Sequence, residues 1–325
     1  MATYKGIQGY TVQKLSSDPT ASEAEGQLYY NSSIGKFKVA VAAAGAWATG
    51  GTAGSAVNLR GTAGTQTAAI AMGGTPYTAN SETYNGTAWT ETNNLVNSRT
   101  SVGASGTTTA AIAFAGYNGG DKNFCETWNG TSWTEGNNIN TARQTPMSLG
   151  KTSTAAVCVG GQPPGSGQGT SETYNGTSWT EGNNLNTARY EGGGAGTSTS
   201  GVVMGGWDGA RSTKTESYDG TCYTEENDLN VAGTQGGTGG ESATNALNFG
   251  GTTAPTTFVG TAESWNGTSW TEVADLATAR DCSMSAGASN TSALAIGGRT
   301  SPTVRTGISE EWSEPVYTNK TVTVS

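Results

Sequence analysis

Five near-copies of one stretch place aromatic, glutamate and arginine side chains at constant spacing. The clearest copy reads SETYNGTSWTEGNNLNTAR from Ser171 to Arg189, and the others span 81–99, 126–143, 216–233 and 263–280. Three kinds of chemistry are open to such a set. Aromatic rings stack on sugars, arginines bind anions, and paired carboxylates hydrolyse glycosides. Because the set recurs within one chain, each candidate is weighed against a purely structural role in a repeat protein.

The aromatic residues come in pairs, five residues apart, on either side of an Asn-Gly or Asp-Gly turn. The first members are Tyr84, Trp128, Tyr174, Tyr218 and Trp265, and the second are Trp89, Trp133, Trp179, Tyr223 and Trp270. Asn-Gly and Asp-Gly supply the positive φ angles of a tight type I′ hairpin. A ligand platform need not follow the fold period, whereas a core between repeats must. We therefore expect these rings to pack between neighbouring sheets.

The recurrent charged residues leave two interpretations open. The arginines would form a partial ring near one mouth of a central channel and attract an anionic glycan, or each would be structural and bond loop carbonyls or a neighbouring Glu. They are Arg99, Arg143, Arg189 and Arg280, with Gly233 in the remaining copy. A second acidic set follows the second aromatics at Glu91, Glu135, Glu181, Glu225 and Glu272. Glycosidases need two carboxyls ~5–10 Å apart in different environments, so a solvated rim is the better interpretation.

Composition excludes several classes of function. The 325 residues include no histidine, which excludes histidine bases, histidine-containing triads and His-ligated copper or zinc. The net charge of −9, without a basic run, argues against a nucleic-acid partner. No apolar stretch is long enough to span a membrane, and Met1–Gly9 lacks the pattern of a secretory signal. We predict a chain that is not an enzyme and needs neither cofactor nor metal, although calcium at Asp208 or Asp219 stays open.

The four cysteines give no sign of a framework. They are Cys125, Cys158, Cys222 and Cys282, at four different repeat positions and without CxxC spacing. A disulfide set or a zinc site is therefore not expected. We expect small, buried or half-buried residues in a reducing compartment.

The repeat predicts an all-β fold. From Arg60 onward a unit of roughly 45 residues recurs six times, with an apolar run closed by a small-residue pair and then a Glu two residues before the first aromatic. Each unit holds four short strands, with small residues alternating with large ones. A wedge-shaped propeller blade needs such a taper, and no segment has the period of a helical solenoid. We expect six four-stranded blades.

The first 53 residues do not follow the repeat. Ser17-Asp18-Pro19, with Gly26 as a stop, is typical of one short helical turn. Residues 27–31 (QLYYN) and 36–41 (KFKVAV) indicate two strands joined by a turn at 32–35, and the segment around Trp47 imitates the SWTE arm of the later repeats. We divide the chain into an N-terminal attachment module, 1–53, and a propeller, 54–325.

Closure of the ring has two solutions. The spacing of Trp312 and Tyr317 repeats the aromatic pair, so the sixth unit would carry its own fourth strand. Trp47 would then have no place in a six-bladed ring, and it could join the N-terminal strands and the C-terminal TVTVS strand in a seventh, mixed blade. We favour six blades with a packed N-terminal module.

The order Arg, apolar strand, Gly-Gly, variable loop, Glu-x-Tyr, Trp and Leu-x-x-x-Arg resembles the kelch repeat from about Arg60 to Tyr317. The resemblance implies a kelch-like β-propeller. The sequence departs from the kelch pattern at two points. The Tyr-to-Trp spacing is tighter, which we attribute to a two-residue turn, and Gly233 stands where the other copies have an arginine. The segment GQLYYNSSIGKFKVAVAAAGAW resembles short segments of tail-fibre-type virion proteins of marine bacteriophages, on residues that include Tyr29, Tyr30, Lys36 and Trp47.

The connections between the Gly-Gly pair and the Glu-x-Tyr strand vary in length and content, unlike the short, uniform turns. Alternating strand direction puts them on the same face as the segments that link one repeat to the next. Variable loops on a rigid scaffold are a usual place for recognition, although drift explains them equally well. The candidate recognition residues are Tyr77, Tyr117, Lys122, Phe124, Trp207, Asp208, Arg211, Phe258, Arg299 and Arg305.

These observations predict a non-enzymatic bacteriophage virion protein, a tail fibre or receptor-binding protein. Its N-terminal module would bind other virion proteins, and its loops would meet a host surface glycan or another virion protein. It would be assembled in the host cytoplasm, exposed on the particle, and open to homo-oligomerisation. Two alternatives remain: an intracellular kelch-type interaction module, for which flanking helical domains are missing, and a carboxylate-only propeller glycan hydrolase.

Overall fold

The computed structural model describes residues 12–19, 26–42, 45–163, 167–281, 285–314 and 317–323, and within these ranges the regular structure is entirely β-strand. The chain divides into two compact units, Met1–Gly45 with Glu314–Ser325, and Ala46–Ser313. The sequence-based boundary at residue 53 is therefore too late. Residues from Ala46 pair with the last strand of the second unit, and the C-terminal strand pairs within the first.

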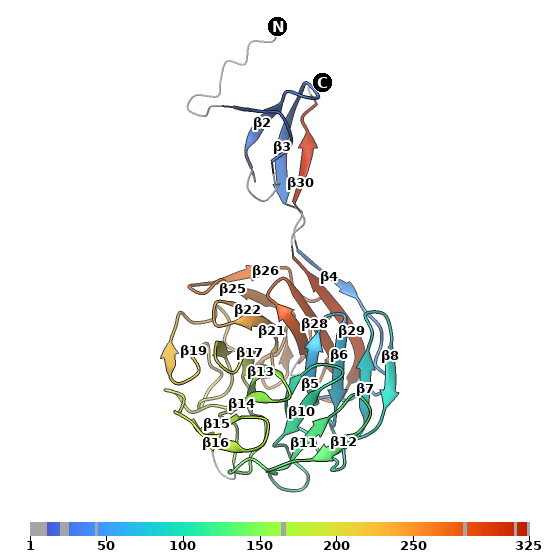
Figure 1. Ribbon diagram of the computed structural model, residues 1–325, viewed down its shortest axis with the longest axis vertical. Helices are drawn as coiled ribbons and strands as arrows, with labels where there is room; N and C mark the ends of the chain where they lie inside the picture. The colour runs from blue at the N-terminus through green and yellow to red at the C-terminus, as the bar shows by residue number, and fades with distance from the viewer. Residues whose placement is uncertain are drawn as a thin grey trace. The chain divides into compact units, whose positions relative to one another are not determined.

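Six four-stranded antiparallel sheets make up the second unit within the described residues (Figure 1). Their strands are β5 (Gly61–Thr65), β6 (Ala68–Met72), β7 (Ser81–Tyr84) and β8 (Trp89–Thr92); β9 (Gly103–Gly106), β10 (Ala111–Phe114), β11 (Cys125–Trp128) and β12 (Trp133–Glu135); β13 (Met147–Thr152), β14 (Ala155–Val159), β15 (Ser171–Tyr174) and β16 (Trp179–Glu181); β17 (Gly193–Gly196), β18 (Gly201–Met204), β19 (Thr215–Tyr218) and β20 (Tyr223–Glu225); β21 (Gly237–Ser242), β22 (Asn245–Phe249), β25 (Ala262–Trp265) and β26 (Trp270–Val273); and β27 (Ser285–Ser289), β28 (Ser292–Arg299), β29 (Arg305–Ser313) and β4 (Ala46–Thr49). A small hairpin of β23 (Thr252–Ala254) and β24 (Thr257–Phe258) lies in the fifth variable connection.

The first strands of successive sheets contact one another in the order β5, β9, β13, β17, β21, β27 and back to β5. This succession surrounds a central channel and is consistent with a propeller-like fold. Glycine is frequent here because the inner strands approach closely. A Cβ atom on Gly194 of β17 would come 2.5 Å from the carbonyl oxygen of Ser148 on β13.

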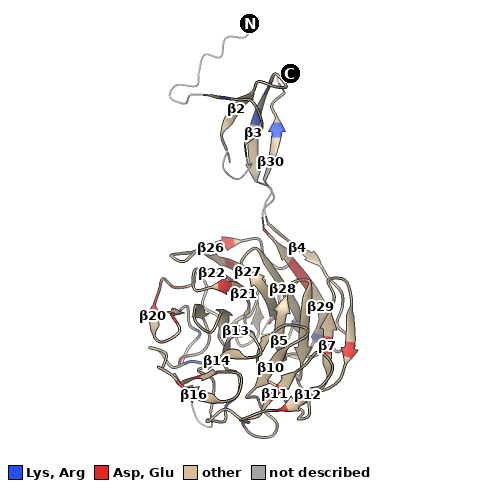
Figure 2. Cartoon of the chain, in the orientation of Figure 1, with Lys and Arg blue, Asp and Glu red and all other residues tan. Residues whose placement is uncertain are grey.

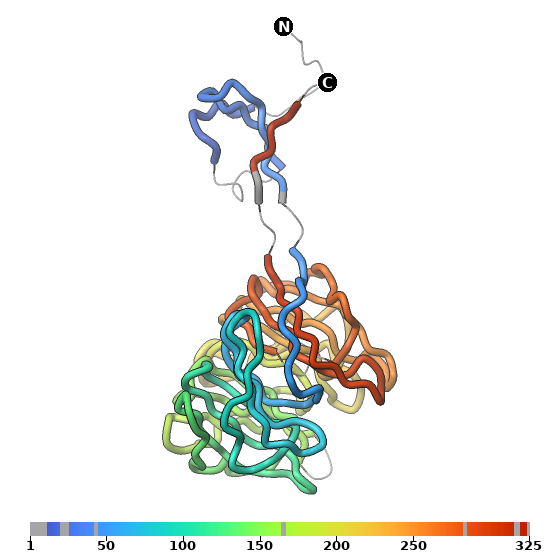
Figure 3. The backbone as a smooth tube through the Cα atoms, turned by 90° about the vertical axis from the view of Figure 1, so that its right-hand side faces the viewer, coloured from blue at the N-terminus to red at the C-terminus, as the bar shows by residue number. Residues whose placement is uncertain are grey.

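The sixth sheet obtains its fourth strand from the start of the unit. Strand β4 pairs antiparallel with β29, and Trp312 lies opposite Trp47. Figure 3 shows the blue segment of β4 running beside the red segment of β29. The expectation that Tyr317 continues the sixth repeat is therefore wrong, and the resemblance of residues 46–49 to the SWTE arm has a structural reason.

The first unit contains one mixed sheet, in the order β1 (Gln13–Leu15), β2 (Leu28–Asn31), β3 (Lys36–Ala42) and β30 (Tyr317–Thr321). The N- and C-terminal strands thus share a sheet as the seventh-blade alternative required, but without Trp47. Lysines lie on β3 and β30 (Figure 2). Asp18 accepts a hydrogen bond from Asn31 Nδ2 (2.6 Å) and pairs with Lys38. Residues 16–17 form a bend and residues 18–19 have no regular secondary structure, so the expected helical turn does not begin there, and 20–25 lie outside the described residues.

The Asn-Gly hairpins exist, but their turn type differs from type I′. Tyr84 pairs with Trp89, so residues 85–88 form the connection. In the five described turns only the glycine has a positive φ, between 89° and 95°. The oxygen Oδ1 of Asn85 accepts hydrogen bonds from the backbone N–H groups of Thr87 (3.0 Å) and Ala88 (2.9 Å). The side chain therefore organises the turn itself, as Asn and Asp side chains often do.

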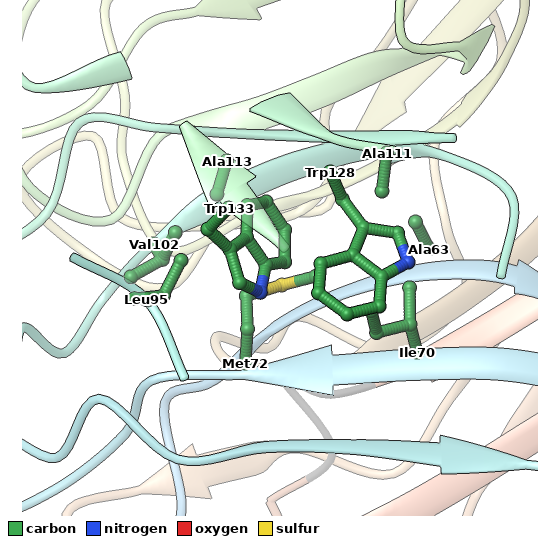
Figure 4. Close-up of a cluster of buried hydrophobic side chains, with 9 residues drawn as sticks. All are labelled: Ala63, Ile70, Met72, Leu95, Val102, Ala111, Ala113, Trp128 and Trp133. Carbon is green, nitrogen blue, oxygen red and sulfur yellow. The ribbon is translucent and has the colours of Figure 1, made fainter. Parts of the chain in front are cut away.

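The paired aromatics lie in clusters shared by neighbouring sheets, as we expected from their recurrence with the repeat. In Figure 4, Trp128 and Trp133 pack over Ile70 and Met72 of the preceding sheet. Trp133 Nε1 donates a hydrogen bond to Ser81 Oγ of that sheet at 3.2 Å. Equivalent clusters contain Trp179, Tyr223 and Trp270, all buried, while Trp89 is half-buried against its cluster. Burial in these clusters takes the rings away from any ligand.

Candidate functional site

The recurrent arginines are structural. Five buried ion pairs join an arginine before one sheet to the Glu on that sheet's third strand: Arg60–Glu82, Arg99–Glu126, Arg143–Glu172, Arg189–Glu216 and Arg280–Glu310. In the third sheet, Arg143 Nη2 lies 2.5 Å from Glu172 Oε1, and both side chains are at most 2% exposed. Each guanidinium also donates to backbone carbonyls, as Arg143 Nη1 does to Gly160 and Thr170. No ring of free arginines is formed within the described residues.

The acids after the second aromatics are exposed: Glu91, Glu135, Glu181, Glu225 and Glu272. Each lies opposite the buried Glu of its own sheet in register, as Glu91 lies opposite Glu82. The exposed set is uniform from sheet to sheet. It matches the solvated rim and not an acid–base pair with two different environments.

The variable connections and the inter-repeat linkers share one face, which we call the loop face. It comprises the described residues of the connections 73–80, 115–124, 160–163 with 167–170, 205–214, 250–261 and 300–304, together with the linkers that follow each sheet. Isolated β-bridges fasten the two kinds of segment together: Thr100 with Tyr117, Gln144 with Gln162, Tyr190 with Trp207, and Thr234 with Thr252. The loops therefore start from fixed positions, and their tips carry the variation.

Most candidate recognition residues form aromatic–cation pairs on the loop face. The Arg211 guanidinium lies 5.7 Å from the centre of the Trp207 ring, and that of Arg299 lies 5.8 Å from the Phe258 ring. The Lys122 ammonium lies 5.9 Å from the Phe124 ring. Such pairs are attractive through the ring quadrupole and present a flat apolar surface next to a positive charge.

The other candidates lie close to these pairs or at loop tips. Tyr77, 45% exposed, lies 5.8 Å from Tyr117 between ring centroids, so the first two loops touch. Asp208 is exposed and accepts a hydrogen bond from Ser212 Oγ at 3.1 Å. Arg305 donates from Nε to Asn58 Oδ1 at 2.8 Å and joins the sixth loop to the start of the ring. The structure thus connects neighbouring loops and does not bring all ten residues to one point.

The channel mouth on this face is built by backbone that sequence reasoning did not identify. Leu59, Ser101, Thr145, Glu191 and Gln235 all have φ between 49° and 60°. Each of the last four donates its N–H to the carbonyl of the one before it, from Ser101 to Leu59 (2.8 Å) through Gln235 to Glu191 (2.8 Å). All five line a central cavity of about 150 Å³. Three of these residues, Ser101, Thr145 and Glu191, stand two positions after a repeat arginine, and Gln235 stands two positions after Gly233, so an alignment of the repeats would have found these four.

Besides Arg60, which is paired with Glu82, the lining of this cavity contains two charged residues, Glu191 and Lys151, whose pKa values are shifted by burial. Burial raises the pKa of the Glu191 carboxyl, against a hydrogen bond from Gln235 and the charge of Arg299. Burial lowers the pKa of the Lys151 ammonium to about 8, although Glu241 opposes the shift. Lys151 Nζ donates to the Gly287 carbonyl at 2.7 Å, across the channel. Perturbed groups in a cavity mark a candidate site, yet these two lack the paired geometry of catalysis.

No group of three His, Cys, Asp or Glu side chains that could hold a metal occurs among the described residues. Within the same ranges no helix is long and apolar enough to cross a membrane. Cys125 and Cys158 are free and buried, as expected, whereas Cys222 is free and exposed because it lies in a turn; Cys282 lies outside the described residues.

Comparisons with known proteins give the fold and no more. No family model matches the chain, and no curated protein does. Solved structures do match, and one, described as "Structure of YjhT", has a TM-score of 0.66 and 11% sequence identity over 82% of this chain and 99% of its own. At this identity the likeness supports an all-β, propeller-like fold.

Proposed function

We propose that this chain is a non-enzymatic structural protein of a bacteriophage particle, a tail fibre or receptor-binding protein with a six-bladed, kelch-like propeller. In this proposal the loop face binds a glycan on the host surface. The sheet that holds β1, β2, β3 and β30 attaches the propeller to other virion proteins, and the protein reaches the cell exterior as part of the particle.

The observation that carries the proposal is that the aromatic residues fall into two groups, one between the sheets and one on the loop face. Nine of the ten fold-repeated rings are buried between sheets and the tenth, Trp89, is half-buried, whereas the irregular loops hold half-buried or exposed rings beside cations, as in Trp207 with Arg211. Sugars stack their C–H faces on such rings, and an adjacent cation suits an acidic sugar. Because the groups come from different loops, a chain of several sugar residues fits them better than a monosaccharide.

The kelch-like assignment is supported by the buried Arg–Glu frame and by six sheets with one strand order. The virion assignment is supported by the N-terminal sequence resemblance and by a separate small unit that holds both ends of the described chain. The absence of histidine from the sequence agrees with a binding role, since the second acids of the repeat are uniformly exposed and the buried ones are ion-paired, except Glu263, which accepts hydrogen bonds from Asn230 and Val231.

Binding of the full chain to a panel of bacterial capsular polysaccharides and lipopolysaccharides tests the loop face. We expect the double substitution Tyr77→Ala and Trp207→Ala to weaken binding roughly tenfold. The matched control is Thr177→Ala, an exposed threonine in an Asn-Gly turn, away from the loops. Equal affinity of the double variant and the native chain would move recognition elsewhere.

Mass spectrometry of purified phage particles that encode the chain tests the virion assignment separately. The expected result is the intact chain in the particle at constant stoichiometry. Its absence from purified particles would overturn the virion role even if glycan binding were found.

A further inference from the structure

The fifth repeat breaks the ion-pair frame of the others. Gly233 stands at the arginine position, yet Glu263 on β25 is kept and is only 2% exposed. Its carboxylate accepts hydrogen bonds from Asn230 N (2.8 Å), Asn230 Nδ2 (2.7 Å) and Val231 N (3.0 Å). Among the described residues, no lysine or arginine forms an ion pair with it. Burial of an anion without a counter-charge is costly.

A cavity of about 20 Å³ lies beside this carboxylate, and its lining includes Gly233, Val231, Asn248, Thr261 and Glu263. This volume is enough for one occupant the size of a water molecule. The cavity is thus bordered both by Gly233, which stands at the arginine position, and by Glu263, which corresponds to the arginine's partner in other repeats.

Three of the lining residues correspond to residues whose backbone carbonyls accept hydrogen bonds from the arginine in other repeats. In the fourth sheet Arg189 donates to the carbonyls of Thr187 and Val203, and in the third sheet Arg143 donates to that of Thr170. Counted along the repeat, the corresponding residues in the fifth are Val231, Asn248 and Thr261. All three line the cavity with Glu263. Three carbonyls and one carboxylate thus form a set of acceptors built for a cation.

A second substitution accompanies the loss of the arginine. The residue opposite the buried Glu on the second strand is small or apolar in five sheets, at Ala71, Ala113, Cys158, Val203 and Ala295. In the fifth sheet Asn248 lies opposite Glu263. A polar residue therefore stands beside the cavity only in the sheet that lacks the guanidinium. If the space were filled by apolar side chains, a polar residue would not be favoured at this position.

We propose that this cavity binds one monovalent cation of about the size of a water molecule, such as potassium or ammonium, in place of the arginine. An all-oxygen set is typical for hard cations. The Glu263 carboxylate balances one positive charge, and Glu191, the other acid of the lining, has its carboxyl pKa raised by burial. A divalent calcium ion takes six to eight oxygen ligands and several carboxylates.

The test is the thermal midpoint of the full chain in potassium, ammonium or sodium chloride against tetramethylammonium chloride, at matched ionic strength. Tetramethylammonium is too large for the cavity. We expect at least one small cation to raise the midpoint by ~2–4 °C at saturation. Equal midpoints in all four salts would overturn the proposal.

Gly233→Arg is the matched variant, because it restores the side chain of the other repeats. Apart from its chain neighbours, a Cβ at Gly233 would meet only the Thr252 carbonyl oxygen within 4 Å among the described residues, at 3.5 Å, so the backbone accepts a side chain at this position. We expect this variant to lose the difference between salts. Glu263→Gln, which keeps the shape and removes the charge, is expected to lose it too. If both folded variants kept the native salt response, the cation would bind elsewhere and the proposal would fail.

Discussion

Trp47 and Trp312 lie opposite each other on neighbouring strands, with ring centroids 5.6 Å apart, although they stand at the two ends of the second unit. In the second sheet, Trp128 and Trp133 lie 5.4 Å apart in the same register, but there a turn connects the two strands. Trp47 Nε1 also donates to the Ala274 carbonyl at 2.9 Å. This contact closes the ring without chain connectivity, so its strength decides how firmly the unit is closed.

Trp47→Ala is expected to lower the free energy of unfolding by ~2–4 kcal/mol, below the full range for a buried tryptophan because Trp47 is half-buried. The loss includes its edge contact with Phe249, 4.8 Å between centroids. Urea unfolding measures it. Trp47→Tyr is the control, since Tyr223 serves at the equivalent place of another sheet, and it should cost ~1 kcal/mol or less. An unchanged midpoint for Trp47→Ala would show that β4 does not hold the ring closed.

Arg143→Met is expected to cost ~3–5 kcal/mol, because it leaves the Glu172 carboxylate buried without its counter-charge. The control is Arg305→Met, which removes an exposed arginine with one hydrogen bond to Asn58 and should cost ~1 kcal/mol or less. Equal losses in urea unfolding for both variants would contradict the structural role of the buried pairs.

Much of the fold was predictable because the same pattern of strands and turns recurs six times in the sequence. The strand order, the hairpin around Asn175-Gly176 and the burial of rings such as Trp179 follow from spacing alone. The ring closure was not predictable, because two segments, around Trp47 and Tyr317, both imitated the fourth strand. Local pattern cannot decide between them, since the choice depends on contacts with β29 that span the unit.

The candidate site was predictable only in part. Irregular loop composition identified Trp207 and Arg211, but not that the two would stack. Glu191 and Lys151 were missed because a single acid or base in a Gly-rich segment has no sequence signature. Their importance comes from burial in a channel, which arises only when six sheets are assembled.

The stability of the protein should increase as pH rises from about 8 toward the ordinary lysine pKa of 10.5, through Lys151. Its folded-state pKa, about 8, lies below the unfolded value, so in this window the unfolded chain binds a proton that the folded chain does not. Below pH ~8 both states are protonated and the penalty is fully present. The expected contribution is roughly 2–4 kcal/mol.

Comparison with Lys151→Met isolates this effect, because cysteines oppose it. Burial raises the pKa of Cys125 to about 11 and of Cys158 to about 12, so these thiols stay neutral in the folded state while the unfolded chain ionises, and stability falls above pH ~9. The difference in unfolding free energy between variant and native chain should therefore shrink from pH 7 to pH 10. A constant difference would show that the Lys151 ammonium is not destabilised by burial.

Asp281→Asn should loosen the loop face more than any exposed acid does. Asp281 is fully buried and accepts from Arg299 N (2.5 Å) and Nε (2.6 Å), while Arg299 Nη2 donates to Gln235 Oε1 (3.0 Å) and its guanidinium lies over Phe258. One carboxylate thus holds an arginine that contacts two other segments.

Asparagine keeps one acceptor oxygen but turns an NH₂ group toward an N–H donor and leaves Arg299 without its counter-charge. We expect a loss of ~2–4 kcal/mol and faster hydrogen exchange at Gln235 and Arg299. Asp208→Asn, at an exposed position of the same face, is the matched control and should change neither quantity. If both variants exchanged at the native rate, Arg299 would be held by the Phe258 ring and Gln235 rather than by Asp281. The loop face would then be positioned by stacking, and substitution of Phe258, rather than of the acid, would be the change that mobilises it.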